Sequence, residues 1–317
     1  MLKTIIINSL KILVAAGLIY WLVSSGKLDF QLLTKLKDHP LAVLLATLLS
    51  LLNFVIISFR WKTILKSRSQ VTLPILGLLK ITWIGQFFSS VLPGSVSGDL
   101  VKMLYVQKFD PSFSKKFVLA SILIDRVMGL CGLILLVGMS SLIFGSQISG
   151  HSPAMIPLLN FNYLLMILVV LSFLVFYFFH HWIRGFLERI QSIGLKEIFS
   201  KIINLWDDLV LIKHQMLQAI ALSIGVQFVG VVIFWSLIQP FVENHMNFIQ
   251  ALAFIPIGLI TLALPVAPSG LGVGHAIFQK LFELTSITNG ASLFNLYFVV
   301  CLVVNIFGVI PYITSKR

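Results

Sequence analysis

The sequence predicts an all-α polytopic membrane protein that forms a single transmembrane domain over residues 1–317. Of these residues, 58% are hydrophobic and only 11% are charged, so the chain has too little polar sequence to cover a globular surface. Apolar runs of about 20 residues recur along the chain, and each is long enough to cross the hydrocarbon core of a bilayer. We therefore expect lipid to cover much of the surface.

Six of the apolar runs are continuous and predict spanning helices. The first, Ile5–Val23, follows Lys3 and has features of a secretory signal, but no small-x-small cleavage site is evident after it. We interpret it as a retained helix. The other predicted spans are Leu41–Phe59, Phe117–Phe144, Ile156–Phe179, Leu217–Ile238 and roughly Ser292–Ile313.

Two further segments, Leu73–Val106 and Phe248–Leu284, predict re-entrant helical hairpins. Each begins with an apolar stretch that runs into a cluster of proline and glycine, at 93–98 and at 265–274. Proline removes an amide donor and glycine weakens a helix, so each cluster should break the helix near membrane depth. Such broken backbone persists only where protein or a water-filled cavity satisfies it.

The distribution of basic residues predicts the orientation. With both hairpins re-entrant, the two termini share one side with most of the 23 Lys and Arg residues, Arg60 among them. The predicted outer loops, Gly145–Met155 and Gln239–Asn247, contain no Lys or Arg. We therefore expect both termini on the cytoplasmic side of a bacterial-type inner membrane. Because the basic residues lie between apolar runs, the formal net charge of +12 indicates membrane anchoring and not nucleic acid binding.

This orientation predicts an inverted-topology repeat with two oppositely oriented hairpins. The first hairpin enters from the cytoplasm and the second from outside, so the order span, span, hairpin, span occurs twice, in about 1–150 and about 156–317. Many secondary transporters have this layout, and their paired broken helices form a site at the bilayer midplane.

The cytoplasmic segment at about 181–215 combines apolar positions at near-helical spacing with charged residues. This pattern predicts an amphipathic helix at the membrane interface, the alternative being an ordinary solvated linker.

Ionisable residues at membrane depth are the main functional candidates, because burying them there is costly. Asp99 and Lys102 lie three residues apart on the return limb of the first hairpin, where they can pair on one helix face or simply mark the interface. Asp125 and Arg126 interrupt a predicted span and point about 100° apart, so their partners are expected on neighbouring limbs, Asp99 with Arg126 being one option. A guanidinium can also grip a lipid phosphate, and both roles stay open for Arg126.

The second hairpin offers glycines and a histidine. Glycines let backbone amides approach a ligand, and a helix that begins near Gly272 would direct its positive end at a cavity. His275 could couple transport to protons or fill a structural role. The candidate substrate-binding residues are thus Pro93, Gly94, Ser95, Gly98, Asp99, Lys102, Asp125, Arg126, Pro268, Ser269, Gly270, Gly272 and His275.

Catalytic signatures are missing from the sequence. It contains no paired-carboxylate, Cys/His metal-spacing, Walker or nucleophile-elbow motif, so we predict no metal and no cofactor, and an enzyme is less favoured than a transporter.

Four ordered motifs carry a family resemblance over nearly the whole chain. They are Arg60-Trp61-Lys62, the Leu-Pro-Gly-Ser-Val-Ser-Gly-Asp run at 92–99, the Asp-Arg-Val-Met-Gly-Leu run at 125–130 and the Pro-Ser-Gly-Leu-Gly-Val run at 268–273. The sequence resembles the flippase-like family named after the transmembrane domain of lysylphosphatidylglycerol synthase. That resemblance implies movement of aminoacylated or otherwise modified lipids between leaflets.

Two departures limit this resemblance. The family usually has Pro-Gly-Gly and then Arg-Glu in the second hairpin, where this chain has Pro268-Ser269-Gly270 and Gly274-His275, so the role of that carboxylate is not carried over. The soluble aminoacyl-transferase domain of the full synthase is absent from the sequence, so lysyl transfer is not assigned.

The leading hypothesis is a flippase for an anionic phospholipid, an aminoacylated lipid or a lipid-linked sugar, with headgroups entering between the two hairpins. Arg126 would meet the phosphate. An intramembrane enzyme acting on a lipid or polyprenyl phosphate is an alternative, with Asp99, Asp125 and His275 as its candidate bases. A third possibility is a subunit that supplies lipid to a separately encoded lipid-modifying enzyme.

Overall fold

The computed structural model describes residues 34–66, 69, 72–91, 97–107, 109–149, 155–193, 200, 203, 206–207, 210, 213–242, 246–263, 273–287 and 289–314. Its regular elements in these ranges are all helices, which confirms the predicted fold class. They are α3 (Pro40–Leu65), α4 (Ile75–Val91), α5 (Ser97–Val106), α6 (Lys115–Ser149), α7 (Met155–Ile193), α9 (Lys213–Ile238), the 3-10 turn η1 (Gln239–Phe241), α10 (Phe248–Ala263), α11 (Val273–Glu283), α12 (Gly290–Ile306) and α13 (Val309–Thr314).

Within the described ranges, five helical segments are long and apolar enough to cross a membrane. They are Pro40–Leu65, Lys115–Ser146, Ile156–Arg189, Lys213–Phe241 and Gly290–Thr314. Each contains one of the spans predicted from hydropathy, because the thickness of the hydrocarbon core sets the length of an apolar run. The sixth predicted span, Ile5–Val23, lies outside the described residues.

Shorter helices occupy the limbs of the two predicted hairpins. The apolar helix α4 packs against α5, and α10 packs against α11. The proline and glycine clusters that separate these limbs fall mainly at 92–96 and 264–272, outside the described part of the chain. The re-entrant path and the inverted repeat stay predictions.

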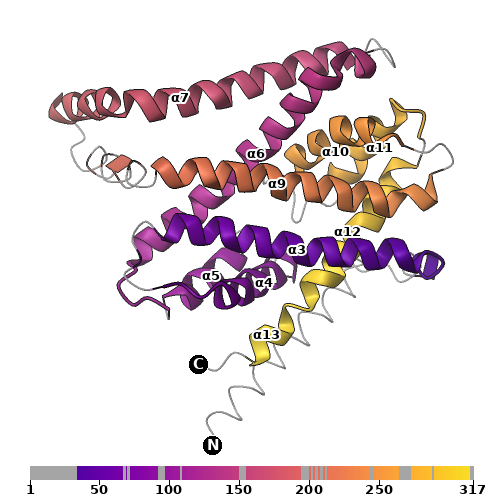
Figure 1. Ribbon diagram of the computed structural model, residues 1–317, viewed down its shortest axis with the longest axis horizontal. Helices are drawn as coiled ribbons and strands as arrows, with labels where there is room; N and C mark the ends of the chain where they lie inside the picture. The colour runs from indigo at the N-terminus through magenta and orange to yellow at the C-terminus, as the bar shows by residue number, and fades with distance from the viewer. Residues whose placement is uncertain are drawn as a thin grey trace, which may run out of the picture.

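Helices α3 and α9 lie side by side and form the centre of the molecule, with α6 crossing both (Figure 1). They run antiparallel, since the rings of His39 and Phe241 meet edge to face at one end, while Lys66 and His214 line a common pocket at the other. Helix α7 packs on α6 and leaves most of its apolar surface exposed, as expected of a lipid-facing helix.

The two largest packed regions among the described residues surround this centre. The larger one joins α9, α10, α11 and α12 through aromatic rings, among them Phe234 stacked on Tyr297 and Phe278 stacked on Phe294. The second joins α3, α4, α5 and α6 around the fully buried Trp61. This second region contains the charged candidates.

Helix α7 extends past its predicted end. Its backbone leaves helical geometry at Phe179, where φ is −111° and ψ is 15°, and then continues as helix to Ile193. Arg184, on this extension, pairs with Glu188 one turn later and with Asp207. The first part of the predicted amphipathic segment is therefore helical, and its placement at the membrane interface stays a prediction.

A glycine permits the close crossing of α6 and α9. A Cβ placed on Gly132 would lie 2.5 Å from the Ser223 Cβ and 2.7 Å from the Ser223 carbonyl carbon. Small residues at such crossings let membrane helices approach each other.

We predict that Gly132→Ala destabilises the protein by about 1–3 kcal/mol, because the added methyl group meets backbone that cannot easily move. Gly225→Ala on α9 is the matched control, since a Cβ there has no neighbour within 4 Å among the described atoms. Thermal unfolding in detergent measures the effect. Equal melting temperatures for the two variants would contradict the close crossing.

Candidate functional site

The charged candidates of the first half converge on one cavity of about 290 Å³ between α3, α4, α5 and α6. Asp99, Lys102, Asp125 and Arg126, four of the candidates from the sequence, all line it. The complete lining is Ile57, Arg60, Trp61, Gln86, Ser89, Asp99, Lys102, Ile122, Asp125 and Arg126.

A buried ion pair forms one wall of this cavity. Arg60 on α3 donates from Nε to Asp125 Oδ1 at 2.7 Å and from Nη2 to Asp125 Oδ2 at 3.0 Å, which is a bidentate arrangement. The remaining Nη1 donates to Ser223 Oγ on α9 at 3.0 Å. Arg60 and Asp125 are both buried, so one pair ties together α3, α6 and α9. Charges survive such burial only when they are paired and hydrogen-bonded.

Glycine on α6 makes room for this pair. A Cβ on Gly129 would lie 3.2 Å from Arg60 Nη1, so a larger side chain would press on the guanidinium. The Gly129 carbonyl also accepts a hydrogen bond of 3.0 Å from Gln227 Nε2 on α9. The same turn of α6 thus supports the arginine and the helix beside it.

The second ion pair is more open. Arg126 Nε lies 2.6 Å from Asp99 Oδ2, which confirms the pairing that the sequence offered as one option. The Asp99 side chain is 9% exposed, whereas that of Arg126 is 42% exposed. Arg126 is therefore the more accessible arginine of the two ion pairs. A guanidinium has five N–H donors, more than one carboxylate can use.

Lys102 departs from the predicted pairing with Asp99. The geometry of α5 turns the Asp99 carboxylate to Arg126 on α6, and Lys102 Nζ lies 5.7 Å from the centre of the Trp61 ring instead. The Trp61 indole in turn donates to Ser121 Oγ at 3.2 Å. Lys102 is not a member of the ion pairs found among the described residues, although the charges of Asp125 and Asp99 act on it through space.

The cavity lining carries a formal excess of one positive charge. Its cations are Arg60, Lys102 and Arg126, and its carboxylates are Asp99 and Asp125. Because the two ion pairs neutralise two arginines, the ammonium of Lys102 provides the excess. Gln86 and Ser89 add neutral hydrogen-bonding groups from α4.

Polar residues on the apolar helix α4 explain how this cavity is built. Thr82 accepts a hydrogen bond from Ser58 on α3 at 3.1 Å, and Ser90 accepts one from Asn305 on α12 at 2.8 Å. A Cβ on Gly85 would lie 2.7 Å from the Lys102 Cε, so this glycine leaves the space that the lysine stem fills. Helix α4 is thereby fixed on both sides of the cavity.

Other predicted site residues lie elsewhere. The half-buried His275 on α11 meets Phe294 edge to face, with ring centres 5.0 Å apart, and is not part of the cavity lining. Gly98 packs against the Gly85 carbonyl and Ser89 Oγ and so serves the α4–α5 contact. The remaining candidates, Pro93, Gly94, Ser95, Pro268, Ser269, Gly270 and Gly272, lie outside the described residues.

The sequence-based search missed several residues of the cavity. Arg60 was counted among the cytoplasmic anchoring residues because it ends an apolar run close to Lys62 and Lys66. The structure places it in the buried pair. A recognisable signal existed on α4, where Thr82, Gln86 and Ser89 recur at helical spacing in an otherwise apolar helix.

We predict that Arg60→Gln or Asp125→Asn alone destabilises the protein by about 3–5 kcal/mol, because each leaves an unpaired buried charge. The double variant Arg60→Met with Asp125→Leu removes both charges and should be more stable than either single variant. Thermal unfolding in detergent measures all three. Arg184→Gln breaks an exposed pair and should change little. Single variants as stable as Arg184→Gln would contradict a structural role for the pair.

Comparison of the sequence with known proteins identifies its family. Residues 8–311 match the family described as the lysylphosphatidylglycerol synthase TM region. A relative, the UPF0104 membrane protein PH1989 of Pyrococcus horikoshii, is 23% identical over 135 residues, which are 42% of this chain and 39% of that protein. The match thus spans about two fifths of the relative's length. The family description refers to a synthase of a membrane lipid. Since the match covers nearly the whole chain, this protein belongs to the lysylphosphatidylglycerol synthase TM region family.

Proposed function

We propose that this protein is a flippase that moves an anionic lipid between leaflets and binds the lipid phosphate in the cavity between α3 and α6. The observation that carries the proposal is the excess positive charge of the cavity lining. Lys102 and the open side of Arg126 would contact the phosphate. The substrate class is an anionic phospholipid, an aminoacylated lipid or a lipid-linked sugar.

The cost of charge in a membrane protein supports an anionic ligand. An ammonium away from bulk water is unfavourable unless it is paired or solvated, and polar groups in such places mark substrate paths. A phosphate diester carries one negative charge, which matches the excess that Lys102 contributes. It also has several acceptor oxygens, so it can bind Lys102 and Arg126 together.

Exposed apolar residues on two of the helices that line the cavity support a lipid as the carrier of that phosphate. Leu100 and Leu104 on α5 and Leu123 and Val127 on α6 are all exposed. They belong to the same two helices that provide Asp99, Lys102 and Arg126. A headgroup could thus enter the cavity while its acyl chains stay in the surrounding bilayer.

The order of the helices supports the proposed inverted repeat. In the described residues, a long apolar segment precedes and follows each short pair. Helices α3 and α6 flank α4 and α5, and α9 and the segment Gly290–Thr314, which joins α12 and α13, flank α10 and α11. In the proposed topology the two pairs are re-entrant from opposite sides, and both termini lie on the cytoplasmic side of a bacterial inner membrane. Such repeats move against one another to expose a site alternately.

A headgroup-transfer assay in reconstituted vesicles tests the proposed function. The probe is a phosphatidylglycerol with a fluorescent headgroup-side label, whose arrival in the outer leaflet is read by an impermeant quencher. Lys102→Met should slow transfer by roughly tenfold or more, the factor expected for one lost charge-assisted hydrogen bond. Arg126→Ala should abolish it.

Lys62→Met is the matched control for this assay. Lys62 lies in the last turn of α3 and lines a different pocket. Its loss should therefore leave transfer unchanged. Unchanged transfer by well-folded Lys102→Met and Arg126→Ala variants would overturn the proposal. Covalently altered lipid in the recovered vesicles, detected by mass spectrometry, would replace transport with catalysis.

A further inference from the structure

A second, apolar pocket of about 390 Å³ lies between α7 and α9, with part of α6 at its base. It shares no residue with the charged cavity. Its lining is Leu135, Val169, Val170, Phe173, Leu174, Phe176, Tyr177, Phe178, Lys213, Met216, Leu217 and Ile220. We call this pocket the α7–α9 groove.

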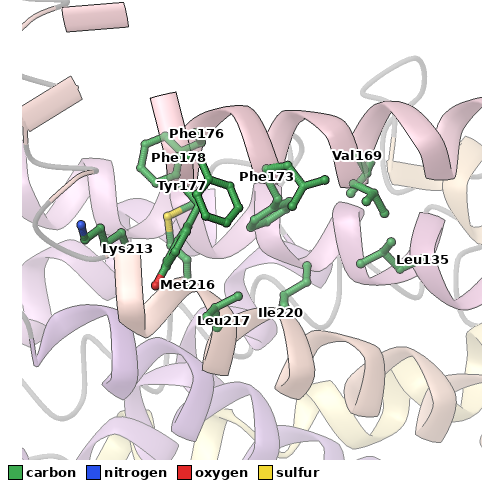
Figure 2. A pocket seen from close by; sticks show the side chains of 12 residues that line it. Leu135, Val169, Phe173, Phe176, Tyr177, Phe178, Lys213, Met216, Leu217 and Ile220 are labelled. Carbon is green, nitrogen blue, oxygen red and sulfur yellow. The ribbon is translucent and has the colours of Figure 1, made fainter. Parts of the chain in front are cut away.

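The polar groups of this groove gather at one end. Figure 2 shows the amine of Lys213 and the hydroxyl of Tyr177 at that end, and Val169 with Leu135 at the other. Lys213 Nζ lies 5.8 Å from the centre of the Tyr177 ring. The groove therefore has a cationic mouth and an apolar body.

The same end of the helix bundle carries further basic side chains. Lys62, Lys66 and His214 line a polar pocket beside the other face of α9. A cluster of basic residues at the end of apolar helices is typical of the membrane surface. Lys213 is thus placed at the level of lipid headgroups, and the groove runs from there along the apolar part of α7.

The groove is accessible from the lipid phase. Leu174 and Leu217, which line it, are both about half exposed, and α7 packs mainly on α6. From Val169 to Tyr177 the helical rise gives a length of about 12 Å. This length accommodates part of an acyl chain that starts at the membrane surface.

We propose that the α7–α9 groove binds one anionic glycerophospholipid, with an acyl chain along its apolar walls and the phosphate at Lys213 and Tyr177. The charge of Lys213 complements a phosphate, and the rest of the lining offers only apolar contact to the chain. Trp182, which is exposed on the extension of α7 beyond this end, marks the interfacial region where amphipathic rings gather. The site does not depend on the proposed transport, because it uses other residues.

Photolabelling in vesicles tests this site. The full chain is reconstituted in phosphatidylcholine doped with phosphatidylglycerol that carries a photoactivatable group in one acyl chain, and labelled residues are mapped by mass spectrometry. Labels should concentrate at residues 169–178 and 216–220. Lys213→Gln should lower this labelling by about fivefold, the contribution of one basic residue beside an anionic headgroup. Lys213→Arg should retain it.

A filling variant tests the apolar body of the groove. Leu217→Trp should remove labels from the groove, while Leu164→Trp, at an exposed α7 position outside the lining, should not. Equal labelling by a phosphatidylcholine probe, or labelling that Lys213→Gln and Leu217→Trp leave unchanged, would identify ordinary boundary lipid and overturn the proposal.

Discussion

The buried pair of Arg60 and Asp125 is the interaction on which the rest of the site depends. It joins α3 to α6, and through Ser223 it also joins α9, so the three helices that cross at the centre share one polar contact. In an apolar setting neither charge is tolerable alone. Any rearrangement that separates α3 from α6 must therefore break a bidentate pair, and these two helices act as a fixed frame.

The neighbouring residue of the same helix has the opposite character. Adjacent positions on α6 point about 100° apart, so Asp125 is directed to α3 while Arg126 is directed to Asp99 on α5. The side chain of Arg126 is 42% exposed, whereas that of Asp125 is 10% exposed. The Asp99 carboxylate can use only some of the five N–H donors of the Arg126 guanidinium. In the proposed mechanism, a lipid phosphate competes with Asp99 for Arg126 while the Arg60 pair stays intact.

Hydropathy predicted most of the fold because bilayer thickness controls the length of apolar runs. The five long apolar helices within the described residues were found this way, and α7 extends beyond its apolar run because hydropathy reports the apolar length and not the helix end. Asp125 and Arg126 were found because they interrupt an apolar run. Arg60 was missed because its burial depends on where Asp125 lies, and a position beside basic neighbours indicates anchoring equally well.

That both hairpins line one site stays a prediction. The cavity takes its charged residues from α3, α5 and α6, and the described part of the second predicted hairpin contributes none of its lining. His275 meets the Phe294 ring and is not part of this lining. In the proposed function, the first half of the chain therefore binds the lipid phosphate, and the second half moves against it.

A cryo-EM structure of the protein in nanodiscs rich in phosphatidylglycerol would show directly whether a lipid phosphate occupies the charged cavity. We expect density for a phosphate within hydrogen-bonding distance of Lys102 Nζ and the Arg126 guanidinium, with Arg60 still bound to Asp125. A cavity that holds only water, with lipid phosphates confined to the outer surface of the protein, would contradict it.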